Sequence, residues 1–288
     1  MNGLKVAAAL ASLLCSAAAA AAEPRAGEVY EIVATYETSS TTSDGSSSSS
    51  RGGSAIQERV VAVRPDGVEL EYDLPAGLGA EERAHNWRLP ARVLARPGGP
   101  MQLLNASELE TRLDAWLKAA GWTREVCGRW IFTWNAFFIE CDPQSILKEL
   151  QALDLRSLEG REGAVYADPH ARAPAVLKRA SGGAGGETFV AVLEIDPAAA
   201  RRARAESDVA VGEILGKPVT LEAALEARAK ERLSGTLTVT LETDPTGAVR
   251  RLTRRTEVET ERADGESEAE TRIETIERIP KPEPPAGR

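Results

Sequence analysis

Four side chains in the sequence have the chemistry of a metal or redox site: Cys127, Cys141, His85 and His170. Two cysteines and two histidines match the ligand types and number of a zinc site, but this spacing with isolated histidines fits no usual zinc pattern. In an oxidising compartment, two such thiols form a disulfide instead. The sequence therefore predicts a Cys127–Cys141 disulfide, and no cofactor or metal.

Only His85 and His170 titrate near neutral pH without perturbation, so a histidine-dependent enzyme must use one of them. Neither lies in a known catalytic sequence, and the chain lacks the G-x-S-x-G, H-E-x-x-H and G-x-x-x-x-G-K-[ST] motifs. We therefore interpret the protein as non-enzymatic. An enzyme with an unrecognised site near one of the two histidines is the lesser alternative.

Residues 1–22 have the pattern of a secretory signal peptide, with Lys5 before the apolar run 6–14 and small residues after it. This pattern predicts cleavage after Ala22 and a periplasmic or extracellular protein. A membrane anchor is the alternative, but the run is diluted by alanine and lacks a flanking charge cluster. Cys15 does not follow a small residue, which argues against lipid attachment there.

The chain is acidic, with 35 Lys and Arg against 44 Asp and Glu and a formal net charge of −9. A negative surface argues against nucleic-acid binding and against adhesion to anionic lipid. No later stretch is apolar for long enough to span a bilayer. The partners that remain are an amphiphilic ligand or another envelope protein, with the oligomeric state left open.

The first part of the expected mature chain reads as strands. Alternation of apolar and polar residues predicts strands at 27–37, 56–63 and 68–74, the last two joined by a Pro-Asp-Gly turn. The strand at 27–37 has one apolar face, formed by Tyr30, Ile32, Ala34 and Tyr36. Between these strands, the Ser/Gly-rich tract 39–55 has no apolar periodicity and is predicted to be a mobile loop.

Helical periodicity follows between residues 105 and 155. A helix is predicted from Ser107 to Gly121, and Asp142-Pro143 predicts the start of a second one. The disulfide-flanked segment between them is β-branched and aromatic, which predicts a hairpin turning near residues 134–136.

Apolar surface on both faces of this hairpin needs a second partner, so its rings are our candidate ligand or partner contacts. The candidates are Trp130, Trp134, Phe137 and Phe138. The alternative is that rings such as Trp130 only fill the core beneath the helices.

The remaining chain is read as a second region of strands and helices. The glycine-rich segment 181–186 is the best internal boundary between an N-terminal α+β region, 23–180, and a C-terminal α+β region, 181–279. Helices are predicted after Asp196-Pro197 and Thr220, then a strand meander and a disordered tail at 280–288.

A cluster of arginines in this meander has two interpretations: an anion-binding patch, or a solvated face of cross-strand ion pairs, which we favour. Its members are Arg250, Arg251, Arg254 and Arg255.

Two antiparallel meanders with helices between them predict an α+β fold, in which both regions share one curved sheet packed on helices. This outline resembles the half-barrel of bacterial periplasmic lipoprotein carriers, which hold acyl chains between a curved sheet and its helices. The resemblance concerns the order of strands and helices and transfers no residue. Two leading hypotheses follow: an envelope protein that binds an apolar or amphiphilic ligand, and an assembly factor that contacts another envelope protein.

Overall fold

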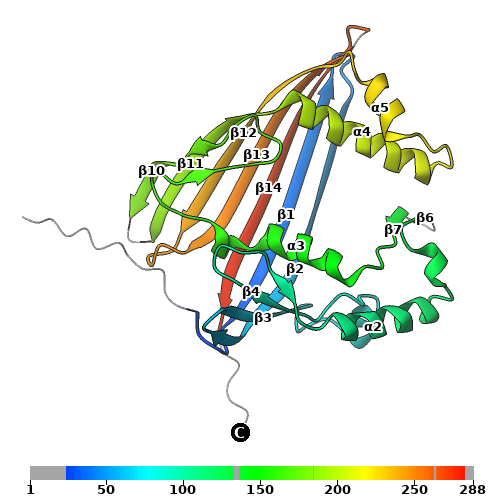
Figure 1. Cartoon of the computed structure of the whole chain (residues 1–288). Helices are drawn as coiled ribbons and strands as arrows, with labels where there is room; N and C mark the ends of the chain where they lie inside the picture. Colours follow the sequence, from blue (N-terminus) through cyan, green and yellow to red (C-terminus); the bar gives the residue numbers. More distant parts are fainter. Residues whose placement is uncertain (1–23, 133–135, 184, 263, 283–288) are drawn as a thin grey trace, which may run out of the picture.

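A computed structural model describes residues 24–132, 136–183, 185–262 and 264–282. The predicted signal peptide with its cleavage site at Ala22, the ring of Trp134 and residues 283–288 lie outside the described residues. Within them, the chain forms one broad antiparallel sheet with helices packed across one face (Figure 1). This confirms the α+β class.

Ten strands form the sheet, and β1 pairs with β14, so both halves of the chain share it. The edges are β10 and β5, which leaves the sheet of the described residues open. In spatial order the strands are β10 (Lys178–Gly183), β11 (Gly186–Glu194), β12 (Arg232–Thr243), β13 (Val249–Glu261), β14 (Ser267–Lys281), β1 (Val29–Thr42), β2 (Ser47–Arg64), β3 (Gly67–Asp73), β4 (Ala91–Ala95) and β5 (Gln102–Leu103).

The other elements are helices and two small two-stranded sheets. The helices are α1 (Ala80–Ala84), α2 (Ala106–Ala119), α3 (Ile146–Leu153), α4 (Pro197–Ile214) and α5 (Leu221–Ala227). Single 3₁₀ turns lie at Arg124–Val126, Pro143–Ser145 and Leu155–Ser157. The small sheets pair β6 (Trp130–Phe132) with β7 (Ala136–Phe138), and β8 (Val165–Tyr166) with β9 (Ala175–Val176).

Side-chain caps fix three of the predicted helix starts. Asp142 accepts a hydrogen bond from the Gln144 amide at 2.9 Å, and Asp196 and Thr220 cap α4 and α5 in the same way. The start of α2 differs from the prediction, because its N-cap is Asn105 and not Ser107. The Asn105 side chain instead accepts from the Arg92 amide of β4, which ties the helix start to the sheet.

Two separate hydrophobic clusters lie on the helix-covered face, which we call the inner face. The first joins β1–β5 to α2 and α3, with Leu109, Leu113 and Leu150 buried against Tyr72. The second joins β11, β12 and β13 to the 155–157 turn and α4, around Phe189. The alternation predicted for β1 holds, because Ile32 is buried in the first cluster.

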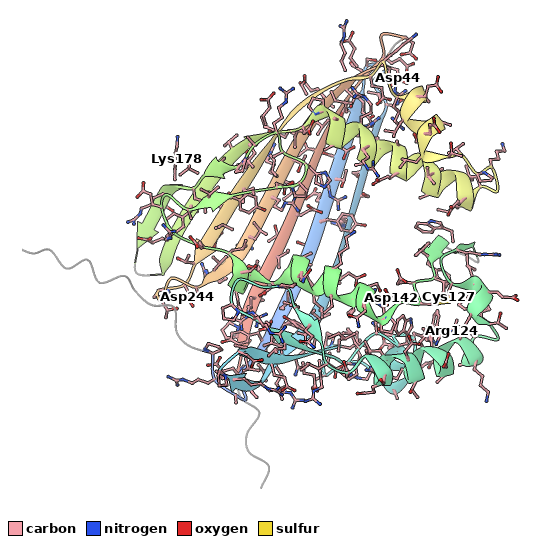
Figure 2. All side chains as sticks on the ribbon, in the orientation of Figure 1. Asp44, Arg124, Cys127, Asp142, Lys178 and Asp244 are labelled. Carbon is pink, nitrogen blue, oxygen red and sulfur yellow. A yellow bond between two sulfur atoms is a disulfide. The ribbon has the colours of Figure 1, made fainter. Side chains whose placement is uncertain are left out.

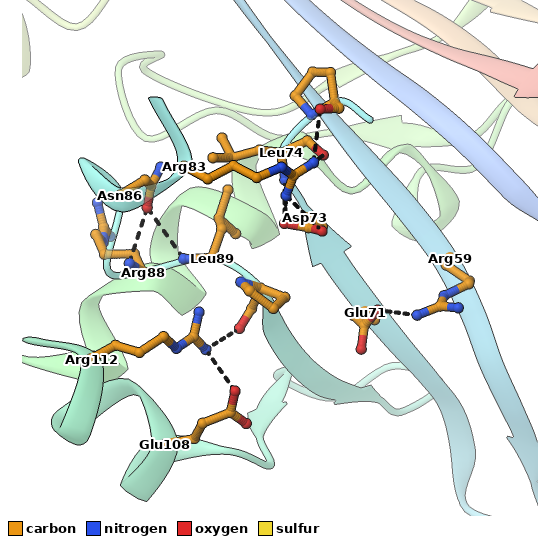
Figure 3. A network of polar contacts seen from close by, with 12 residues as sticks. Arg59, Glu71, Asp73, Leu74, Arg83, Asn86, Arg88, Leu89, Glu108 and Arg112 are labelled. Atoms are coloured by element: carbon orange, nitrogen blue, oxygen red, sulfur yellow. Dashed lines mark hydrogen bonds and ion pairs between the residues drawn. The ribbon is translucent and has the colours of Figure 1, made fainter. Parts of the chain in front are cut away.

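Figure 3 shows how α1 and α2 are held at the β3 and β4 end of the sheet. Arg83 at the end of α1 donates to Asp73 of β3 at 3.0 Å, and its other nitrogen donates to the Leu74 and Pro75 carbonyls. Arg112 of α2 donates to the Pro90 carbonyl just before β4. These charged contacts fix the helices beside the first cluster.

The prediction of a mobile loop at 39–55 is wrong. Thr41 and Ser39 of β1 pair with both β2 and β14, and only the turn between Thr42 and Ser47 is irregular. The prediction relied on apolar periodicity, but backbone pairing to strands on both sides does not require it. At Gly52 the lack of a side chain makes room for the Tyr36 ring, since an added Cβ would lie 2.6 Å from it.

The predicted internal boundary at 181–186 and the predicted start of the tail at 280 also fall on strands. The segment 181–186 includes the end of β10 and the start of β11, so it connects two strands of one hairpin. A side chain at Gly186 would lie 2.0 Å from the Thr243 carbonyl oxygen, which explains the glycine there. The predicted tail begins two residues too early, because β14 runs to Lys281.

A buried ionic network joins the sheet to the 155–157 turn. Glu58 of β2 lies 2.8 Å from Arg278 of β14 and accepts a hydrogen bond from Tyr72 of β3 at 2.9 Å. Arg156 donates to the Tyr72 hydroxyl at 3.1 Å. Burial raises the pKa of Tyr72, and the Glu58 carboxylate raises that pKa further, so the phenol stays a donor.

Removing the carboxylate of this network should cost more than removing the phenol hydroxyl that bonds to it. We expect Glu58→Gln to lower the free energy of unfolding by about 3 kcal/mol, because Arg278 would lose its buried counter-charge. Tyr72→Phe should cost less, about 2 kcal/mol, because it removes hydrogen bonds to charged groups but keeps the Glu58–Arg278 ion pair. Urea denaturation of both variants measures the difference, and equal losses would contradict this account.

Candidate functional site

The aromatic segment connects the end of α2 at Ala119 to the start of α3 at Ile146. We call this connection the arm. The Sγ atoms of Cys127 and Cys141 are 2.02 Å apart, as the sequence predicted, with their Cα atoms 5.5 Å apart. The disulfide lies at the base of the β6–β7 hairpin, in which Trp130 pairs with Phe138. Figure 2 shows Cys127 on this arm, beside Asp142 at the start of the returning chain.

The described rings of the arm pack on one another and, through Trp122 and through Trp116 of α2, on the first hydrophobic cluster. Trp116 and Trp122 have ring centroids 5.5 Å apart, and Trp122 and Phe137 have theirs 6.0 Å apart. Trp130 meets the edge of Phe138 at 5.8 Å, and Phe138 remains 43% exposed. Phe137 therefore packs towards α2, whereas Phe138 is open to solvent.

The arm reaches across to the other side of the inner face, where β6 contacts α4. Helix α4 itself lies against β12. Together α3, the β6–β7 hairpin and α4 surround a part of the inner face that no helix covers, over β14, β1 and β2 (Figure 1). We call these three elements the rim.

A groove of about 390 Å³ lies on this part of the inner face. Of the candidate rings that the structure describes, Trp130, Phe137 and Phe138, none lines it. Its inner-face and α3 side chains are Ala34, Tyr36, Ser54, Leu252, Arg254, Arg272, Glu274, Ile276, Ala152 and Leu153.

Strand register orders the lining into rows of increasing polarity. In the first row, beside α3, Ile276 pairs with both Leu252 and Ala34. In the second row, Glu274 pairs with Arg254 and Tyr36.

In the third row, Arg272 pairs with Thr256 and Thr38. Because directly paired residues share a face, the groove changes from apolar to charged along the strands.

The charged end holds its arginines by shared carboxylates. Glu274 accepts from Arg272 at 2.8 Å and lies 3.6 Å from Arg254. Arg254 also pairs with Asp168, a nearly buried carboxylate from the loop after β8. The Arg272 guanidinium lies 5.3 Å from the centroid of the Tyr36 ring, where a cation–π contact favours the charge.

Tyr166 lies beside this cluster, and burial raises the pKa of its phenol. Arg254 lowers that pKa, whereas Asp168 and Glu274 raise it. The phenol is therefore neutral at physiological pH and adds no charge to the groove.

Neither histidine lies in the groove. His85 is an exposed residue at the end of α1, and His170 is exposed in the loop after β8. Among the described residues, no three His, Cys, Asp or Glu side chains gather as a metal site. Across the same residues, every helix is too short or too polar to cross a membrane.

The four predicted arginines do not form one patch. Arg251 and Arg255 lie on the outer face, where they pair with Glu277 and Glu257, whereas Arg254 lies on the inner face. Cross-strand ion pairs, the interpretation that we favoured, are therefore present on both faces.

Sequence reasoning missed Arg272 and Ile276 of β14. Apolar and charged residues do not alternate regularly along that strand, so its sequence does not show which side chains share the inner face. Tyr36 and Ala34 were identified as one face of a strand. Their role in a groove depends on where α3 ends on the sheet, and the sequence pattern of β1 alone does not predict that position.

Comparison with known proteins adds no family. No protein-family description and no curated protein matches the chain. One solved structure, described as a conserved protein of unknown function with a hot dog fold from Alicyclobacillus acidocaldarius, is 12% identical over 90% of this chain and 81% of that one. Its TM-score is 0.08, which is too low to support an argument.

The disulfide should stabilise the arm. By the chain-entropy estimate, closing a loop of about 15 residues contributes roughly 3 kcal/mol, so replacing Cys127 and Cys141 by serine should lower Tm by several degrees. Thermal unfolding with and without reductant measures this, and the double-serine variant, which should not respond to reductant, is the control. A Tm that is the same in all four conditions would show that the bridge contributes nothing.

Proposed function

We propose that this protein is an exported, non-enzymatic envelope protein that binds an amphiphilic small molecule in the inner-face groove. The observation that carries the proposal is the groove itself, which is apolar beside α3 and charged at Arg272. Ligand sites are typically concave and mostly apolar, with a few placed polar groups. A volume of about 390 Å³ is at the lower end of the usual range of about 300–1,000 Å³.

The rim supports a binding role for the groove. The arm is cross-linked at its base and rests against α4, so it holds α3 and α4 apart over the sheet. The disulfide also supports export, because such bridges persist in oxidising compartments. Cell fractionation, with and without residues 1–22, tests this part of the proposal.

A second candidate function, an assembly factor, is favoured by exposed apolar side chains around the hairpin and α4. Phe138 is 43% exposed, and Val211 and Leu215 of α4 are 49% and 66% exposed. If this surface binds another envelope protein, crosslinking in cells should recover a defined complex that Phe138→Ala weakens. Recovery of the monomer alone would count against it.

Blocking the groove tests the ligand proposal. Isothermal titration calorimetry and native mass spectrometry with dodecanoate and dodecanol should show one bound chain per protein. Ser54→Trp places an indole in the groove, and we expect it to weaken binding by at least about tenfold, or about 1.4 kcal/mol.

Ala55→Trp is the matched control, because consecutive residues of a strand point to opposite faces. It should bind like the unmodified protein. Absence of any bound chain, or equal binding by Ser54→Trp, would contradict a ligand site in the groove.

A further inference from the structure

We propose that the ligand of the groove is a single-chain amphiphile with an anionic head, and that the head binds at Arg272. This inference rests on the proposed function and adds the class of ligand. Its basis is the order of the rows, the free hydrogen-bond donors at the charged end, and the fixed position of Arg272.

The rows give the ligand a direction. The apolar row at Ile276 and the charged row at Arg272 are four residues apart on β14, or about 13 Å at 3.3 Å per residue. Ala152 and Leu153 of α3 line the groove at its apolar end. A single chain would lie along the strands with its tail towards α3 and its head towards α4.

Three polar groups at the head end have donor capacity left over. The Thr38 hydroxyl and the Arg254 Nε are buried with no hydrogen-bond partner. Arg272 uses Nε and Nη2 on one oxygen of Glu274, so its Nη1 is without a bond to the described residues. Thr38 pairs directly with Arg272 on the neighbouring strand.

Such leftover donors favour an acceptor-rich head over a cationic one. Buried polar groups in proteins nearly always have a partner, so these donors call for acceptors from outside the chain. A carboxylate or phosphate supplies only acceptors, and the Arg fork binds it with two parallel bonds. A cationic head would instead have to compete with Arg254 and Arg272 for Glu274, which already contacts both.

Stacking prepares Arg272 for this role. Its guanidinium lies over the Tyr36 ring, whose position is in turn allowed by Gly52 on β2. A preordered side chain loses less rotational freedom when a ligand binds, which favours affinity. The head site is therefore formed before the ligand arrives.

Four ligands with the same dodecyl chain test the proposal: dodecanoate, dodecyl phosphate, dodecanol and dodecyltrimethylammonium. By calorimetry below their critical micelle concentrations, we expect either anion to bind the unmodified protein at least about tenfold more tightly than the alcohol. The cation should bind most weakly. The stronger of the two anions identifies the head as carboxylate or phosphate.

Arg272→Gln should remove the preference for anions, so that dodecanoate and dodecyl phosphate bind this variant no more tightly than dodecanol does. Arg255→Gln is the matched control, because Arg255 lies on the outer face opposite Ile273 and should keep the full preference. Arg272→Lys keeps the charge but loses the fork, and should lower the preference partway.

Thermal unfolding confirms that each variant is folded. Equal binding of anion and alcohol by the unmodified protein, or an unchanged preference in both Arg272 variants, would overturn the inference while leaving the proposed function intact. Binding of none of the four ligands would instead overturn the proposed function.

Discussion

The sheet is wider than the helices that pack on it, and this mismatch determines the rest of the structure. Ten strands spaced about 4.8 Å apart span roughly 43 Å, whereas a helix with its side chains is about 10 Å across. The helices therefore bury two separate hydrophobic clusters, one over β1–β5 and one over β11–β13. The two clusters share Ile276 of β14, which packs against both, and beyond Ile276 the centre of the inner face carries charged side chains.

Ion pairs stabilise the charged part of the inner face. Arg254 and Arg272 share Glu274 across β13 and β14, and Arg204 of α4 pairs with Glu268 at 3.0 Å. Arg204 ties α4 to the sheet, whereas Arg254, Glu274 and Arg272 lie where no helix covers the strands. The same side chains form the charged end of the groove, so one feature accounts both for the uncovered centre of the sheet and for the ligand that we propose.

Sequence patterns predicted the features of this fold that depend on residues close to one another in the chain. The alternation at Ile32 and Ala34 gave a strand face, and Asp196 and Thr220 gave helix starts, because caps and pleats involve near neighbours. Segment 39–55 was missed because its β1 part pairs with β14, more than two hundred residues away, and its β2 part pairs in turn with β1. The groove was missed for a related reason, since its lining residues from four strands and α3 come together only after the sheet has formed and α3 has packed on it.

The central claim is that the uncovered centre of the inner face holds an amphiphile with its head at Arg272. A crystal structure with dodecanoate brominated at its methyl end tests this most directly, because anomalous scattering locates the bromine. The account predicts bromine beside Leu252, Ile276 and Leu153, with the carboxylate at Arg272. Bromine at the aromatic hairpin, or anywhere outside the groove, would contradict it.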